Sequence, residues 1–97
     1  MAASKIRQIF EELKEDLPLK RTVVLRIVPM KGHASCSLSD SEKLITICIN
    51  SRDSETVQTD SIIHEYGHAM EYDQLGNHSK FWGECQAKAY TAWAKRH

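Results

Sequence analysis

Three segments of the chain place hydrophobic residues at helical intervals, and the first covers residues 4 to 17. Charged residues fill the positions between the hydrophobic ones, which are Ile6, Ile9, Phe10, Leu13 and Leu17. Pro18 lacks the amide hydrogen that a further helical turn would need, so the helix is expected to end before it. This segment is predicted to be an amphipathic scaffold helix.

Two further segments have the composition or the alternation of strands. Residues 22 to 28 form a β-branched run that ends before Pro29, and residues 44 to 50 alternate isoleucine with Thr46, Cys48 and Asn50. Both patterns are typical of β-strands. The residues between them, 31 to 43, carry Gly, Ser and Asp, which predicts a turn or a short third strand.

A second helix is predicted to begin near residues 51 to 56, where Asp53 or Ser54 can cap it. It should run to about Leu75, because Gly76-Asn77 tolerates the left-handed backbone conformation of a helix C-cap.

A last helix is expected over residues 80 to 95. The predicted order is therefore α-β-β-α-α, in a small α+β fold whose short sheet packs on the second helix. The sequence shows no linker or internal repeat, so residues 1 to 97 are expected to form a single domain.

Composition narrows the classes of function. Thirteen Lys and Arg residues balance thirteen Asp and Glu residues, so there is no strong nucleic-acid signal. No stretch approaches the roughly 20 apolar residues of a membrane span, and no signal peptide is recognisable. The three cysteines have no paired spacing, which predicts reduced thiols. The protein is therefore expected to be soluble and cytoplasmic, with no membrane partner.

The second helix contains the run His64-Glu65-Tyr66-Gly67-His68, a His-Glu-x-x-His motif. Residues four apart lie on one face of a helix, about one turn apart, so the imidazoles of His64 and His68 can bind one metal ion. Zinc suits this ligand type. Glu65 lies one step off that line, where its carboxylate can reach a metal-bound water as general base.

A catalytic zinc usually has three protein ligands and one water, so a third ligand must come from elsewhere. His78 is the best candidate, since the turn after the second helix can bring it back toward the ion. Glu84 is the rival, because a carboxylate on the following helix can complete a two-His-one-Glu site. Glu71 shares the metal-binding face and is better placed to contact a metal ligand or the substrate than to bind the ion directly. Asp73 has the same choice, but for both acids a solvated surface position is the favoured expectation.

The motif followed by His78-Ser79-Lys80-Phe81-Trp82 resembles the SprT-like and WLM-type zinc metallopeptidases, small relatives of the gluzincin and minigluzincin group. The resemblance is loose over residues 44 to 93 and closer over residues 61 to 82. It implies a strand beside the cleft, an active-site helix, and zinc held by His64, His68 and His78 with Glu65 as base.

The expected function is therefore zinc-dependent hydrolysis of a peptide or protein substrate, with Zn²⁺ as cofactor and Glu65 as general base. One alternative is a zinc-stapled binding module without turnover. A second is a deformylase-like amide hydrolase: peptide deformylases share the motif but take their third ligand from an upstream cysteine, and Cys36 is the candidate here. Ile63 and Gly67 depart from that family, which has Gln and Asp there.

Two further expectations concern substrate. An oxyanion donor is common in such sites, and His33, Tyr66, Tyr72 and Tyr90 are the candidates. The resemblance also implies that the strand before the active-site helix borders the cleft. Residues 44 to 50 are thus expected to offer a free edge on which an extended peptide docks through main-chain hydrogen bonds.

Overall fold

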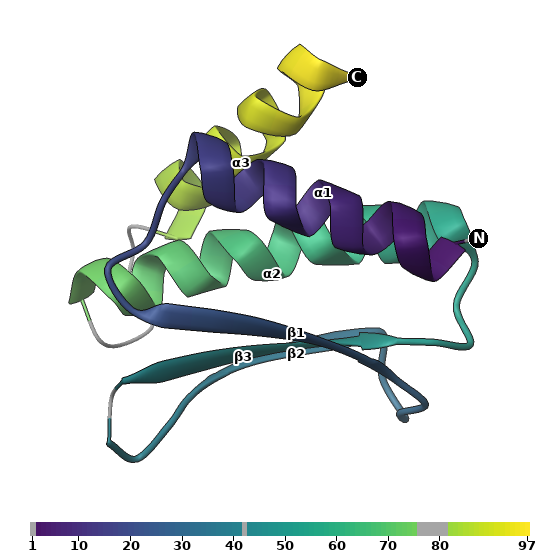
Figure 1. The fold of residues 1–97 in the computed structure, drawn as a ribbon, viewed down its shortest axis with the longest axis horizontal. Coiled ribbons are helices and arrows are strands. Elements are labelled where there is room, and N and C mark those ends of the chain that lie inside the picture. The colour runs from purple at the N-terminus through teal and green to yellow at the C-terminus, as the bar shows by residue number, and fades with distance from the viewer. Residues whose placement is uncertain (1, 42, 76–81) are drawn as a thin grey trace.

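The computed structural model describes residues 2–41, 43–75 and 82–97, and within these ranges the chain forms three helices and three strands. Their order is α-β-β-β-α-α, which confirms the α+β fold and adds one strand to the predicted order. The elements are α1 (Ala2–Asp16), β1 (Thr22–Val28), β2 (Ala34–Leu38), β3 (Leu44–Asn50), α2 (Glu55–Leu75) and α3 (Trp82–Arg96). The three helices lie on one side of the sheet, with α2 nearest to the strands (Figure 1).

Strand β3 is the central strand of the sheet, which has the order β1-β3-β2. It pairs in parallel with β1, Leu25 lying opposite Ile47, and antiparallel with β2, Cys36 lying opposite Ile47 from the other side. The expectation that residues 44 to 50 offer a free edge is therefore wrong. A strand with one buried face looks the same in sequence whether one or two neighbours pair with its backbone.

At the edge strand β2, every second residue directs its main-chain N–H and C=O groups away from the sheet. The amide of Asn50 donates to the carbonyl of His33 at 2.9 Å, and the amide of Ser39 donates to the carbonyl of Leu44 at 2.8 Å. Because bonded residues alternate along an antiparallel strand, positions 35 and 37 also bond to β3. The main-chain groups of Ala34, Cys36 and Leu38 therefore point outward from the sheet.

One face of the sheet and the inner faces of the helices build the core. Ile45, Ile47 and Ile49 are fully buried on the face of β3 that α2 covers. Four members of the predicted stripe join them, and the fifth, Leu17, is half-buried just after the end of α1. The buried residues of the helices are Ile6, Ile9, Phe10, Leu13, Ile62, Ile63, Tyr66, Ala69, Met70, Cys85 and Ala89. This burial fixes the rotation of α2 about its own axis, and with it the direction of the motif side chains.

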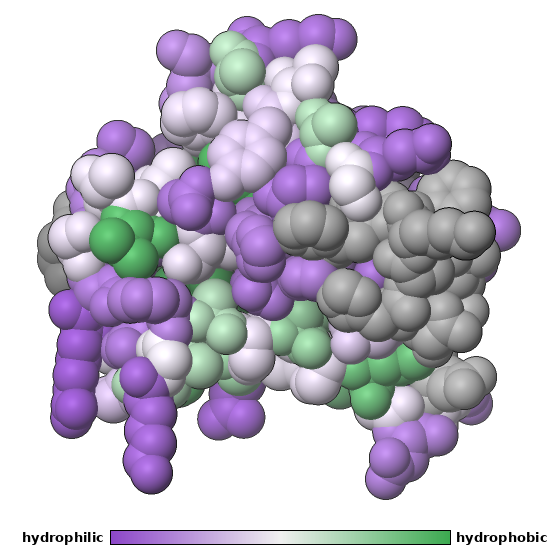
Figure 2. Space-filling model, turned by 180° about the vertical axis from the view of Figure 1, so that it is seen from behind, coloured by the Kyte–Doolittle hydropathy of each residue, from purple (hydrophilic) through white to green (hydrophobic). Residues whose placement is uncertain are grey.

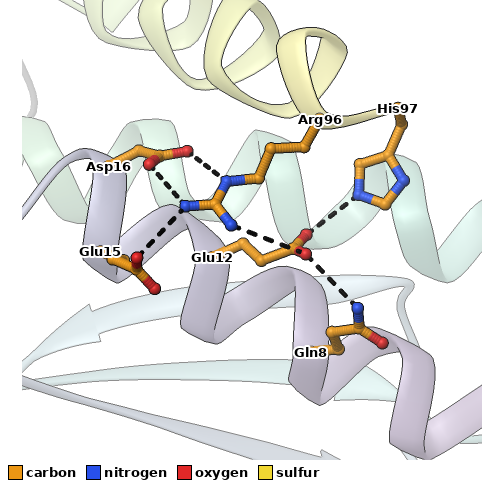
Figure 3. A network of polar contacts seen from close by, with 6 residues as sticks. All are labelled: Gln8, Glu12, Glu15, Asp16, Arg96 and His97. Carbon is orange, nitrogen blue, oxygen red and sulfur yellow. Dashed lines mark hydrogen bonds and ion pairs between the residues drawn. The ribbon is translucent and has the colours of Figure 1, made fainter.

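Two sets of polar contacts fix the ends of the helices. The hydroxyl of Ser54 accepts a hydrogen bond from the amide of Val57 at 3.3 Å, so Ser54 is the N-cap of α2, as its position predicts. At the other end of the chain, the guanidinium of Arg96 donates to both carboxylate oxygens of Asp16 at 2.7 Å, which ties α3 to α1 (Figure 3). His97 hydrogen-bonds Glu12 beside this pair.

Candidate metal centre

The two motif histidines converge on one point in space. Their Nε2 atoms lie 3.3 Å apart, and the ring planes meet at 74°. Two nitrogen ligands at about 2.0–2.1 Å from a tetrahedral zinc ion would lie about 3.3 Å apart. The spacing of the two imidazoles would therefore suit two ligands of one zinc ion, the ion that the motif predicts.

Glu65 completes a group of three ligand-type side chains, because atoms of His64, Glu65 and His68 all lie within 4.8 Å of one another. The residue is only 8% exposed. Burial disfavours the charged carboxylate and raises the pKa of Glu65 to about 7 in the metal-free protein. A carboxyl group with this pKa can both accept and release a proton near neutral pH.

The rotation of α2 puts the two histidines between β2 and α3. Glu65 is one residue beyond His64 and turns toward β2, where its charge acts on Cys36. Gly67 turns the other way and meets Gln86 of α3. His64 and His68 occupy the half-buried stripe between these contacts. Figure 2 shows the molecule from behind, where small hydrophobic areas are separated by hydrophilic residues.

The structure describes only one of the two candidates for the third ligand. His78 lies outside the described residues. Glu84 is exposed on α3, and the metal-capable group formed by the described residues does not include it.

Glu71 and Asp73 are not the solvated surface acids expected from the sequence. Glu71 is 1% exposed, and its carboxylate lies 4.0 Å from Nδ1 of His68. The carboxylate of Asp73 accepts hydrogen bonds from the amides of Lys20 and Arg21, at 3.0 and 2.8 Å. Asp73 therefore anchors the α1–β1 loop to α2, while Glu71 lies beside the imidazole of His68.

Cys36 is close enough to Glu65 to feel its charge but lies outside the metal-capable group. Burial, then the charges of Glu65 and Cys48, raises the pKa of the Cys36 thiol to about 12. Because Cys36 lies outside the metal-capable group of the described residues, the structure does not favour the ligand arrangement of a deformylase.

The four candidate oxyanion donors have different surroundings. The hydroxyl of Tyr66 is committed to the core, where it donates to the carbonyl of Leu17 at 2.6 Å. Tyr90 donates to the carboxylate of Asp60, and His33 pairs with Asp53 at 2.8 Å while remaining 74% exposed. Tyr72 is half-buried, and its pKa is raised by burial and then by the charges of Cys36, Glu71 and Glu65. Tyr72 is the candidate whose surroundings include the carboxylate of Glu65.

Sequence reasoning missed Gln86, which packs against the motif. A Cβ atom on Gly67 would lie 2.8 Å from Oε1 of Gln86 and 3.1 Å from its Cα. The glycine inside the motif therefore allows α3 to approach α2 between the two histidines. The only signal in the sequence is that small residue, which does not say what approaches it.

Comparisons with known proteins identify no relative: no family model matches the chain, and no curated protein or solved structure is significantly similar to it. The family resemblance therefore rests on the motif and the residues after it. None of the helices in the described parts of the chain is long and apolar enough to cross a membrane.

Proposed function

We propose that the protein is a zinc-dependent metallopeptidase. The observation that carries the proposal is the convergence of two imidazole Nε2 atoms 3.3 Å apart, beside a desolvated carboxylate. A structural zinc site closes with four protein ligands and needs no base beside the metal. The buried position of Glu65 therefore favours an enzyme over a zinc-stapled binding module.

In the proposed mechanism, His64, His68 and His78 hold the ion and Glu65 moves the proton. Bound zinc supplies a lowered pKa for a water molecule and charge stabilisation for a peptide carbonyl oxygen. Glu65 accepts a proton from the attacking water and passes it to the leaving amine. Partial exclusion of solvent around Glu65 keeps the proton transfer between the carboxylate and the substrate.

The extended substrate in this proposal pairs with β2, not with β3. The outward main-chain groups of Ala34, Cys36 and Leu38 form a sheet edge, and Cys36 lies close to Glu65. A peptide on this edge gains main-chain hydrogen bonds that require no particular side chains. Its scissile bond then passes the face of α2 that carries the motif.

The test is peptide cleavage by the zinc-loaded protein and by Glu65→Gln. This variant keeps the size of the side chain and all three proposed ligands, so zinc content should be unchanged while cleavage falls by at least about 100-fold. Glu11→Gln, at an exposed position of α1, is the matched control and should retain full activity. Cleavage by Glu65→Gln at the parental rate would refute the proposed mechanism.

A second pair of variants identifies the third ligand. His78→Ala should lower zinc affinity, and Glu84→Ala should leave it unchanged, because only the first removes a ligand. The opposite result would establish the two-His-one-Glu arrangement.

A further inference from the structure

The side-chain amide of Gln86 is buried at the contact between α2 and α3. Both its oxygen and its nitrogen are inaccessible to solvent, and neither has a hydrogen-bond partner among the described parts of the chain. Folding has removed both atoms from water without replacing those hydrogen bonds, which is unfavourable. Such an amide is a marker of a missing partner or of a functional role.

The neighbours of this amide are set by the helix on which it packs. Oε1 of Gln86 lies 2.8 Å from the position of a Cβ atom on Gly67. On an α-helix, the residues that neighbour position 67 lie three and four residues before and after it. They are Ile63 and Met70, which are buried in the core, and His64 and Glu71, so the polar side chains on this part of α2 nearest to the Gln86 amide are His64 and Glu71.

Metal binding determines which ring nitrogens carry protons, and the Gln86 amide can accept a hydrogen bond from one of them. The two Nε2 atoms converge, which leaves Nδ1 of each ring to carry a proton when an ion is bound. His68 presents its Nδ1 to the Glu71 carboxylate, 4.0 Å away. His64 lies on the Gln86 side of α2, and an amide oxygen is a suitable acceptor for an imidazole N–H.

We infer that Gln86 is a positioning residue of the metal centre. When His64 and His68 hold a cation, Oε1 of Gln86 accepts a hydrogen bond from Nδ1–H of His64. The amide nitrogen of Gln86 donates to the carboxylate of Glu71, which has several acceptor sites and also faces His68. The amide and the carboxylate together fix the orientation of both rings. The inference rests on metal binding at this site, not on peptidase activity.

The test compares zinc affinity with the stability of the metal-free protein. Gln86→Met has a similar length and no polar atoms, so the metal-free variant should unfold at a urea concentration at least as high as the parent. Its zinc dissociation constant should rise about 10- to 100-fold. Gln86→Glu keeps an acceptor for His64 but loses the donor to Glu71, so its zinc affinity should lie between those of Gln86→Met and the parent. Gln74→Met, at an exposed position of α2, is the control and should change neither measurement.

Two results would overturn the inference. One is parental zinc affinity in Gln86→Met. The other is equal loss of stability in its metal-free and zinc-loaded forms, since that pattern would indicate a packing role only. A parent protein that binds no zinc at this site would refute the metal centre itself, and the inference with it.

Discussion

The buried carboxyl of Glu65 should make the metal-free protein less stable as the pH rises toward neutrality. Its pKa is raised from an ordinary 4.5 to about 7 by burial. An acid whose folded-state pKa is raised contributes stability that is fully present below pH 4.5 and lost as the pH approaches 7. A shift of roughly 2.5 units corresponds to about 3 kcal/mol, at about 1.4 kcal/mol per unit.

Glu65→Gln removes this titration while keeping the shape of the side chain. The difference in unfolding free energy between the variant and the parent should therefore grow by roughly 2–3 kcal/mol in favour of the variant between about pH 5 and pH 8. Urea denaturation at both pH values, with a chelator present, measures it. Zinc should reduce or reverse the difference, because a nearby cation favours the carboxylate. If the difference between variant and parent is the same at both pH values without metal, Glu65 titrates normally and the desolvation argument is wrong.

Three further predictions concern packing and substrate. Gly67→Ala gains about 1 kcal/mol of helix propensity, but the new Cβ would lie 3.3 Å from the backbone nitrogen of Gln86 and would force Gln86 away from α2. Urea denaturation should therefore show a net loss of stability of about 1 kcal/mol. A more stable variant would show that α3 moves away from α2 at little cost. Tyr66→Phe leaves the carbonyl of the half-buried Leu17 without this donor and should lose about 1–2 kcal/mol, whereas unchanged stability would mean that water replaces the hydroxyl. A bound peptide-like inhibitor should slow hydrogen exchange at the amide of Cys36 and not within residues 44 to 50, and the reverse pattern would rule out docking on β2.

The strands show how much of the sheet can be predicted from the pattern of hydrophobic residues. The predicted strands at residues 22 to 28 and 44 to 50 match β1 and β3 at both ends. β1 is recognisable by its β-branched residues, and β3 by the two-residue period of its buried isoleucines. Strand β2 has the sequence Ala-Ser-Cys-Ser-Leu, whose small side chains give that period little contrast. The position of β3 in the centre of the sheet depends on its partners on both sides, which no local pattern encodes.

Some features of the candidate site can likewise be predicted from the local sequence, and others cannot. Convergence of His64 and His68 follows from helix geometry alone, so the spacing of the motif predicts it. Burial of Glu71 depends on tertiary packing, and contact with Gln86 requires α3 to cross α2 at Gly67. These features depend on how separate helices pack, which the local sequence does not determine.

The most direct test of a catalytic zinc centre is a crystal structure of the zinc-loaded protein. We expect one zinc ion, bound by Nε2 of His64, Nε2 of His68 and one further protein ligand. The fourth position should hold a water molecule within hydrogen-bonding distance of Glu65. A fourth protein ligand in that position, or zinc bound away from His64 and His68, would contradict the account.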